Sequence, residues 1–118
     1  MGLGQLERRV MDILWDASDE SLSGRQVAEQ LPDRAYTTVM TILERLRRKR
    51  LLVRSSSGKV HTYRAAASRE SYTASLMLDE LGSAPDRDAV LVRFAQTVSP
   101  EEAVTLRRAL GASKKRAP

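Results

Sequence analysis

The fold is decided by residues 35–64, AYTTVMTILERLRRKRLLVRSSSGKVHTYR. The first half of this stretch carries apolar residues at the three- and four-residue spacing of a single helical face: Val39, Ile42, Leu43 and Leu46. This spacing predicts a helix from about Tyr36 to Lys49, with one face buried and the other exposed.

The second half of the stretch has the pattern of a β-hairpin. Two β-prone runs, 51–54 and 59–64, flank the Ser-Ser-Ser-Gly sequence at 55–58, which favours a turn. On the second strand, His61 shares a face with Tyr63. Because no second metal ligand lies near His61, we expect it to pack against the helices with a polar tip rather than bind a metal.

The exposed face of the predicted helix is rich in threonine and arginine. The positions opposite the buried face, and those flanking them, are Thr37, Thr38, Met40, Thr41, Glu44, Arg45, Arg47 and Arg48. Threonine is a mediocre helix former, but its methyl group can meet a thymine methyl in a major groove, where arginine can bind guanine. We therefore predict base contacts from Thr37, Thr38, Met40, Thr41 and Arg45. The alternative is a neutral exposed face.

Positive charge is concentrated in the same part of the chain. The net charge is +5, and the eight basic residues between Arg45 and Arg64 have no acidic residue among them. A solvated helix face would not require acids to be absent from both a helix end and a hairpin. We therefore expect contact with double-stranded DNA. The predicted backbone contacts are Tyr36, Arg48, Lys49, Arg54 and Lys59.

Two shorter helices are predicted before this stretch. One begins after Gly4, with Glu7 three residues on, and runs to about Trp15. The other begins at Ser23, which forms a capping box with Gln26, and ends before the proline at position 32. Three helices followed by a basic hairpin predict a winged helix-turn-helix domain over residues 1–66, in a chain that is mostly α with a small β-hairpin.

Residues 67–118 predict three further helices and a homodimerisation region. The helices start at Ser68, at Asp86 and at Ser99, and Gly82 and Gly111 are expected to end the first and the third. Their apolar stripes are wide for helices with so little protein to cover. The residues assigned to dimerisation are Tyr72, Leu76, Met77, Leu91, Phe94, Val98, Leu106 and Leu110. An internal three-helix core is the alternative. The basic tail 114–116 is expected to be disordered or to add a DNA contact.

Composition excludes several classes of function. With no cysteine and a single histidine, the chain cannot form a disulfide, a thiolate metal site or a histidine cluster. We therefore expect no cofactor and no metal. Counting does not exclude chemistry by paired carboxylates, but the fifteen acidic residues lie singly or at helix starts without a pocket-like setting, so we expect no enzymatic activity. Charges interrupt the apolar positions of residues 1–15, so we expect a cytoplasmic protein without membrane insertion.

Several segments resemble the BlaI/MecI/CopY family of bacterial transcriptional repressors, particularly its actinobacterial members. They are LERRVMDILW (6–15), RQVAEQL (25–31), AYTTVMTILERLRRKRLLV (35–53) and GKVHTYR (58–64). The resemblance covers nearly the whole chain. It implies a homodimeric winged-helix repressor on a dyad-symmetric operator, with residues 36–49 as the recognition helix and β-lactam resistance or related genes as targets.

The chain departs from the family pattern at several positions. Arg50 stands where the family commonly has a glycine that ends the recognition helix, so either the helix ends differently or Arg50 adds a phosphate contact. Glu44 must either accept a hydrogen bond from cytosine or pair with Arg47 or Arg48. Copper-responsive members carry a cysteine-rich tail that this chain lacks, which argues against copper sensing by that route.

The resemblance also bears on induction. In penicillin-responsive members a membrane sensor protease cuts an Asn-Phe bond, and the matching bond here is Ser75–Leu76, whose residues differ.

An alternative function is a winged-helix module that binds protein within a larger complex, without specific DNA binding.

Overall fold

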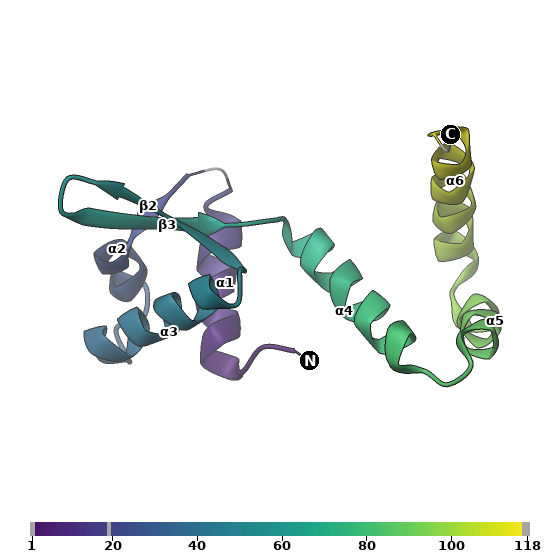
Figure 1. Ribbon diagram of the computed structural model, residues 1–118, viewed down its shortest axis with the longest axis horizontal. Coiled ribbons are helices and arrows are strands. Elements are labelled where there is room, and N and C mark those ends of the chain that lie inside the picture. The colour runs from purple at the N-terminus through teal and green to yellow at the C-terminus, as the bar shows by residue number, and fades with distance from the viewer. Residues whose placement is uncertain (1, 19, 117–118) are drawn as a thin grey trace. The chain divides into compact units, whose positions relative to one another are not determined.

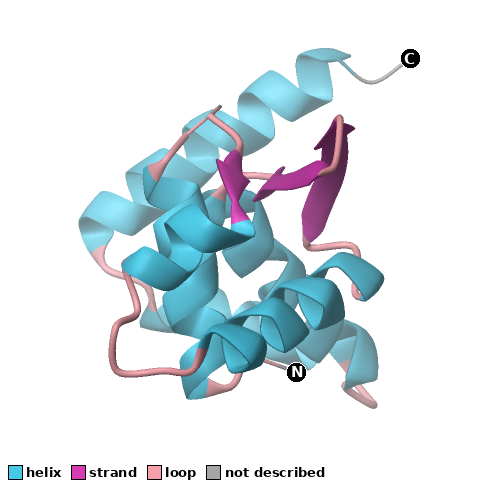
Figure 2. Ribbon diagram, turned by 90° about the vertical axis from the view of Figure 1, so that its left-hand side faces the viewer, coloured by secondary structure: helices cyan, strands magenta, loops and turns pink. Residues whose placement is uncertain are grey.

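A computed structural model describes residues 2–18 and 20–116, with side chains through residue 112, and confirms the predicted fold class (Figures 1 and 2). The elements in chain order are α1 (Gln5–Asp16), β1 (Leu22–Ser23), α2 (Gly24–Glu29), α3 (Tyr36–Arg48), β2 (Leu52–Ser57), β3 (Val60–Ala65), α4 (Arg69–Ser83), α5 (Arg87–Thr97) and α6 (Pro100–Arg116). They form two compact units, Met1–Met77 and Leu78–Pro118, which we call unit 1 and unit 2.

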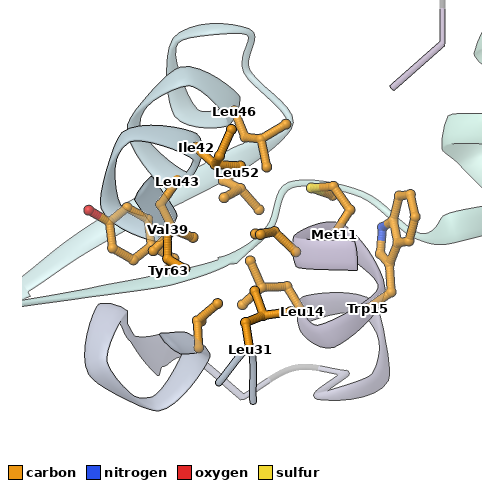
Figure 3. Close-up of a cluster of buried hydrophobic side chains, with 12 residues drawn as sticks. Met11, Leu14, Trp15, Leu31, Val39, Ile42, Leu43, Leu46, Leu52 and Tyr63 are labelled. Atoms are coloured by element: carbon orange, nitrogen blue, oxygen red, sulfur yellow. The ribbon is translucent and has the colours of Figure 1, made fainter. Parts of the chain in front are cut away.

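Unit 1 has a hydrophobic core between α1, α2, α3 and the inner ends of the hairpin strands. Figure 3 shows the buried side chains, with Trp15 at one edge of the cluster and Tyr63 at the other. The buried apolar residues are Val10, Met11, Leu14, Trp15, Val27, Leu31, Val39, Ile42, Leu43, Leu46, Leu52 and Tyr63. All four apolar residues that predicted the buried face of α3 are among them, so this core fixes which face of α3 points outward.

The predicted helix starts are confirmed by their capping hydrogen bonds. At α2 the Ser23 N–H donates to Gln26 Oε1 over 2.8 Å, and the Gln26 N–H donates to Ser23 Oγ over 3.1 Å. Asp86 caps α5, and Ser99 forms a second capping box before α6. These bonds satisfy amide groups that have no partner within a helix, which is why short polar side chains mark the starts.

The sheet has one strand that the sequence did not predict. Its order is β1-β3-β2, and all pairs are antiparallel. In β1 only Leu22 and Ser23 pair, opposite Tyr63 and Thr62. The hairpin is paired from Leu52 opposite Ala65 to the end of the strands, and Gly58 forms its turn with φ of +63°.

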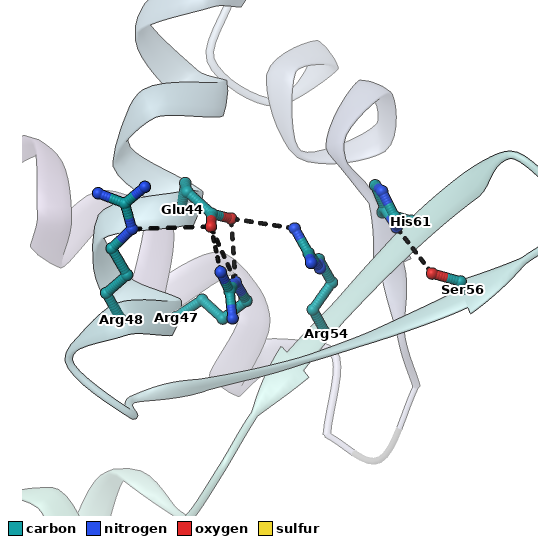
Figure 4. A network of polar contacts seen from close by, with 6 residues as sticks. All are labelled: Glu44, Arg47, Arg48, Arg54, Ser56 and His61. Carbon is teal, nitrogen blue, oxygen red and sulfur yellow. Dashed lines mark hydrogen bonds and ion pairs between the residues drawn. The ribbon is translucent and has the colours of Figure 1, made fainter.

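His61 does not pack against the helices, so that prediction is wrong. Its side chain is exposed, and its Nδ1 lies 2.9 Å from Ser56 Oγ across the hairpin (Figure 4). The reason is the length of the strands: only their inner ends, at Leu52 and Tyr63, lie on the core, while the residues nearer the turn are exposed. Sharing a strand face with a buried tyrosine therefore does not bury His61.

Two helices in the second half continue past the glycines expected to end them. α4 runs through Gly82 to Ser83, and α6 runs through Gly111 to Arg116. Among the residues described, Gly58 is the only glycine with a positive φ, so neither helical glycine adopts the left-handed cap conformation. Glycine costs a helix about 1 kcal/mol relative to alanine, which good neighbouring helix formers can offset. The tail 114–116 is accordingly helical rather than disordered, while its side chains lie outside the described residues.

α3 ends in the left-handed geometry that glycine favours, with Arg50 in its place. Arg50 has φ of +66°, its N–H donates to the Arg47 carbonyl over 2.9 Å, and the Leu51 N–H donates to the Leu46 carbonyl over 3.0 Å. These two bonds form a Schellman motif, the helix end in which glycine is usual at the left-handed position. An L-residue in this conformation costs about 1–2 kcal/mol.

Arg50→Gly should therefore stabilise the protein by about 0.5–1 kcal/mol, because relief of the strained backbone exceeds the added entropy of the unfolded chain. Denaturant unfolding measures the change. Arg48→Gly is the matched control, since the same exchange inside α3 should destabilise by about 1 kcal/mol. A loss of stability in both variants would contradict this reading of Arg50.

Candidate nucleic-acid interface

Four of the five predicted base-reading residues lie together on the exposed face of α3. Thr37, Thr38, Thr41 and Arg45 are all exposed, one and two turns apart along the helix. The Thr41 hydroxyl donates to the Thr37 carbonyl over 2.9 Å, which orients it and leaves its oxygen free to accept. This face presents methyl groups, a hydroxyl acceptor and a guanidinium, the groups that distinguish base edges in a major groove.

Met40 lies apart from those four residues. It is partly buried against the core, and a Cβ atom on Gly24 would collide with its Sδ atom. The thioether therefore fills the space left by Gly24, where α2 and α3 approach closely. The structure favours a role for Met40 in setting the packing of α3 on α2.

The hairpin supplies the second part of the candidate interface. Arg54 on β2 and Lys59 in the turn are exposed, as are Tyr36 at the start of α3 and Arg48 near its end. Val60, 53% exposed, adds an apolar side chain beside the turn. Lys49, which follows α3, is exposed as well, so all five predicted phosphate-contacting residues are exposed.

Glu44 connects the exposed face of α3 to the hairpin. Its carboxylate accepts hydrogen bonds from Arg47 on α3 and from Arg54 Nη1 at 3.3 Å, and it lies 3.9 Å from Arg48 Nε (Figure 4). The hydrogen bond from Arg47 lowers the pKa of Glu44, and the positive charge of Arg47 lowers that pKa further. Of the two alternatives for Glu44, the structure shows the arginine pair, extended by Arg54.

Lys49 also has an intramolecular partner. Its Nζ lies 2.9 Å from Glu7 Oε2 on α1, and the Gly4 N–H donates to Glu7 Oε1 over 3.0 Å. The Glu7 side chain is only 10% exposed, and these bonds, led by that from Gly4, lower its pKa. Lys49 therefore anchors the end of α3 to α1, in addition to any contact it makes with DNA.

The contacts of Glu7 make the free energy of unfolding depend on pH. Because the pKa of Glu7 is lowered from 4.5 in the folded state, its stabilisation is complete above pH 4.5 and is lost as the pH falls through the folded value. Glu7→Gln should lower the free energy of unfolding by about 1–2 kcal/mol at pH 7, and by less at pH 3, which lies below the ordinary pKa of 4.5. Denaturant titrations at both pH values measure this. Glu29→Gln, at an exposed position of α2, should have little effect at either. A Glu7→Gln deficit that is equal at pH 7 and pH 3 would contradict the assignment.

The segment before α3 is also attached to α1 by an ion pair. Two Arg9 nitrogens on α1 donate to the two carboxylate oxygens of Asp33, each over 2.9 Å. This pair lowers the pKa of Asp33 to about 2. Since Asp33 lies in the turn between α2 and α3, α1 is attached both to the segment before α3 and to its end.

Apolar side chains of the second half are exposed. Among residues 78–112, whose side chains are described, none is buried. The large exposed apolar residues there are Leu78, Val90, Leu91, Val92, Phe94, Val104, Leu106 and Leu110. Val90, Phe94 and their neighbours line an apolar hollow on α5. The alternative of an internal three-helix core does not fit residues 78–112, none of which is buried.

The remaining residues assigned to dimerisation vary in exposure. In α4, Met77 is exposed, whereas Tyr72 and Leu76 are partly buried. Val98, which follows α5, is also partly buried. The Ser75–Leu76 bond lies inside α4.

Sequence reasoning assigned Arg64 no specific contact and offered a phosphate contact for Arg50 only as one of two alternatives. Both are exposed, and both lie in the acid-free run that predicted the interface. The strained backbone of Arg50 is the signal that marks it, because a glycine there would fold at lower cost.

Comparison with known proteins places this interface in context. The penicillinase repressor family model matches residues 3–112. The transcriptional regulator BlaI of Mycobacterium tuberculosis is 46% identical over 114 residues, covering 92% of this chain and 82% of that protein. Within the described part of the chain, no helix is both long and apolar enough to cross a membrane.

Solved structures support the winged-helix fold. MepR, a transcription regulator of the Staphylococcus aureus multidrug efflux pump MepA, matches with a TM-score of 0.51 at 16% identity, over 97% of this chain and 79% of that chain. A MepR mutant bound to an oligodeoxyribonucleotide matches with a TM-score of 0.52 at 15% identity, with the same coverage. At these identities the likeness concerns the fold alone.

Proposed function

The chain belongs to the penicillinase repressor family, and on that basis we propose that it represses transcription as a homodimer bound to a dyad-symmetric DNA operator. The family and the relatives are transcriptional regulators, so the chain is a regulator and not an enzyme. The observation that carries the proposal is the outward face of α3, where Thr37, Thr41 and Arg45 lie beside a basic hairpin in a winged-helix fold.

Residues of the interface divide between reading and anchoring. Thr37, Thr38, Thr41 and Arg45 contact base edges in the major groove, while Tyr36, Arg48, Arg54 and Lys59 contact phosphates. Met40 and Lys49, assigned to DNA from sequence, act mainly by holding α3 on α2 and α1, because their side chains already have partners there.

Two copies of the chain join through the second half, residues 67–118. The support is the set of exposed apolar side chains on α5 and α6, because a monomer would leave them in water. A second copy is the natural partner, since closed symmetric dimers are the commonest soluble assemblies and match a dyad-symmetric operator.

The family name favours genes of β-lactam resistance as targets of this repressor. Relief of repression by a membrane sensor protease would require α4 to unwind around Ser75–Leu76, because that bond lies within a helix. The residues at the bond do not match the family's cleavage site, so the chain's own features support the repressor and not this route of induction.

Opposite charge changes at the interface test the proposal. Lys59→Gln should weaken binding to random-sequence duplex and lower the magnitude of the salt slope by roughly one unit, as loss of one phosphate contact does. Glu44→Gln should strengthen the same binding several-fold, because Arg48 and Arg54 lose a competing carboxylate. Fluorescence titrations over a range of salt concentrations measure both.

Glu101→Gln, in α6, is the control for the change in net charge and should leave the slope unchanged. Unaltered slopes for Lys59→Gln and Glu44→Gln would place the basic hairpin away from DNA. That result would favour the winged-helix module that binds protein.

A further inference from the structure

The connection from the hairpin to α4 is attached to α1 by side chains. Trp15, 9% exposed at the edge of the core, donates its Nε1–H to the Ala67 carbonyl over 3.1 Å. This bond joins residues 52 positions apart in the chain. The segment between β3 and α4 is therefore held against α1.

The first turn of α4 is attached to the same part of α1. Arg69 Nη2 lies 3.3 Å from Asp12 Oδ1 and 3.2 Å from Asp16 Oδ1, and its guanidinium carbon lies 5.2 Å from the Trp15 ring centroid. The Tyr72 ring packs on Trp15 with centroids 5.6 Å apart. We call Asp12, Trp15, Asp16, Arg69 and Tyr72 the α4 joint.

Stability alone does not account for the polar half of the joint. The side chains of Asp12 and Arg69 are 41% exposed and that of Asp16 is 72% exposed. Ion pairs this exposed add little to stability, and the hydrophobic core closes without them. These contacts restrict the direction of α4, because two carboxylates and an aromatic ring on α1 contact the same guanidinium on α4.

The direction of α4 matters because the helix acts as a lever. Its 15 residues span roughly 22 Å. A change of about 10° at its first turn therefore moves its far end by roughly 4 Å, which exceeds the rise of about 3.4 Å per base pair of DNA. In a dimer joined through the second half, a small variation in the angle of α4 at the joint would therefore vary the distance between the two winged-helix units.

We propose that the α4 joint is a positioning device that sets the spacing between operator half-sites, with Arg69 as its central residue. The proposal rests on the proposed function, since it requires two chains on one operator. Arg69 contacts no base in this account. It acts through the angle at which α4 leaves the winged-helix unit.

Arg69→Ala is the test variant and Arg8→Ala the matched control. Arg8 also lies over the Trp15 ring, at 5.6 Å, and pairs with Asp12 at 3.6 Å, but it belongs to α1 and bridges nothing to α4. Asp16→Asn is a second test variant, at a position exposed enough to leave folding intact.

The first measurement reports the joint without DNA. Because the chain has no cysteine, Ser57→Cys places one spin label on each hairpin of the full-length dimer. Pulsed electron paramagnetic resonance should give a narrow distribution of distances between the two spin labels for the parent and for Arg8→Ala. The distribution for Arg69→Ala should be about twofold broader, with a smaller broadening for Asp16→Asn. Equal widths in Arg69→Ala and Arg8→Ala would overturn the proposal.

The second measurement uses dyad-symmetric DNA selected from a random duplex pool by the parent protein. One or two base pairs inserted between the half-sites should cost the parent and Arg8→Ala about tenfold in affinity, and Arg69→Ala only about threefold or less. A spacing penalty in Arg69→Ala as steep as in the parent would overturn the role of the joint while leaving the repressor intact. A monomeric parent, or one indifferent to spacing, would contradict the proposed function and the joint with it.

Discussion

Phe94→Asp should convert the protein to a monomer and lower its affinity for operator DNA by about 100-fold or more. Phe94 is 40% exposed on α5 and lines the apolar hollow of that helix with Val90. A carboxylate at its position would have to lose its hydration to enter an apolar interface, and this costs several kcal/mol without a partner charge. Sedimentation measures the dimer, and titration of the selected duplex measures the affinity.

Gln96→Asp is the control for this substitution. Gln96 is exposed on α5, roughly opposite Phe94 around the helix, so the same carboxylate there should leave dimerisation and operator binding near parent values. Circular dichroism should show that Phe94→Asp keeps a folded winged-helix unit, because its core lies entirely within unit 1. A Phe94→Asp monomer that binds the full operator as tightly as the parent would defeat the dimeric repressor.

Arg45→Ala should cost about 1–3 kcal/mol on the selected operator while changing affinity for random duplex much less. Arg45 is exposed on α3, and a bidentate contact between arginine and guanine is the commonest specific contact in the major groove. Thr41→Ala should act in the same direction, because it removes a methyl group and a hydroxyl acceptor from the same face. Competition titrations with operator and random DNA measure the two affinities in one experiment.

Lys59→Ala provides the contrast, because a lost phosphate contact should weaken binding to both DNAs alike. If Arg45→Ala and Thr41→Ala also lower both affinities equally, then the outward face of α3 anchors the protein and does not read sequence.

The parts of the fold that sequence predicted best are those with a local cause. The spacing of Val39, Ile42, Leu43 and Leu46 specifies the buried face of α3, and the Ser23 and Ser99 capping boxes specify where helices begin. β1 was missed because its two residues pair with Tyr63 and Thr62, about forty positions away, and a strand that short has no period of its own.

The errors concern how far an element extends. Gly82 and Gly111 carry the residue type of a helix end, yet α4 continues to Ser83 and α6 continues to Arg116. One glycine costs a helix only about 1 kcal/mol, which does not by itself end it. Arg50 shows the reverse, since the backbone bonds from Arg50 and Leu51 hold an arginine in a conformation that favours glycine. His61 was expected inside because the sequence shows strand alternation but not how far the hairpin extends past the core.

At the candidate interface, sequence predicted the exposed face of α3 and the exposed hairpin residues but not the contacts among their side chains. Sequence offered Arg47 as a partner of Glu44, which the structure shows, but the second partner, Arg54, lies 10 residues from Glu44, and the Glu7 partner of Lys49 lies 42 residues away. No spacing rule predicts an ion pair across such a distance. The same holds for Trp15 and Arg69, whose contact brings α1 and α4 together.

The most direct test of the account is the mass of the complex on DNA, measured by sedimentation with the selected dyad duplex and with a duplex carrying one half-site. We predict two protomers on the full duplex, bound cooperatively, and binding at least about 100-fold weaker on the half-site. One protomer bound to the full duplex at undiminished affinity, or equal affinity for selected and random DNA, would contradict the dimeric repressor.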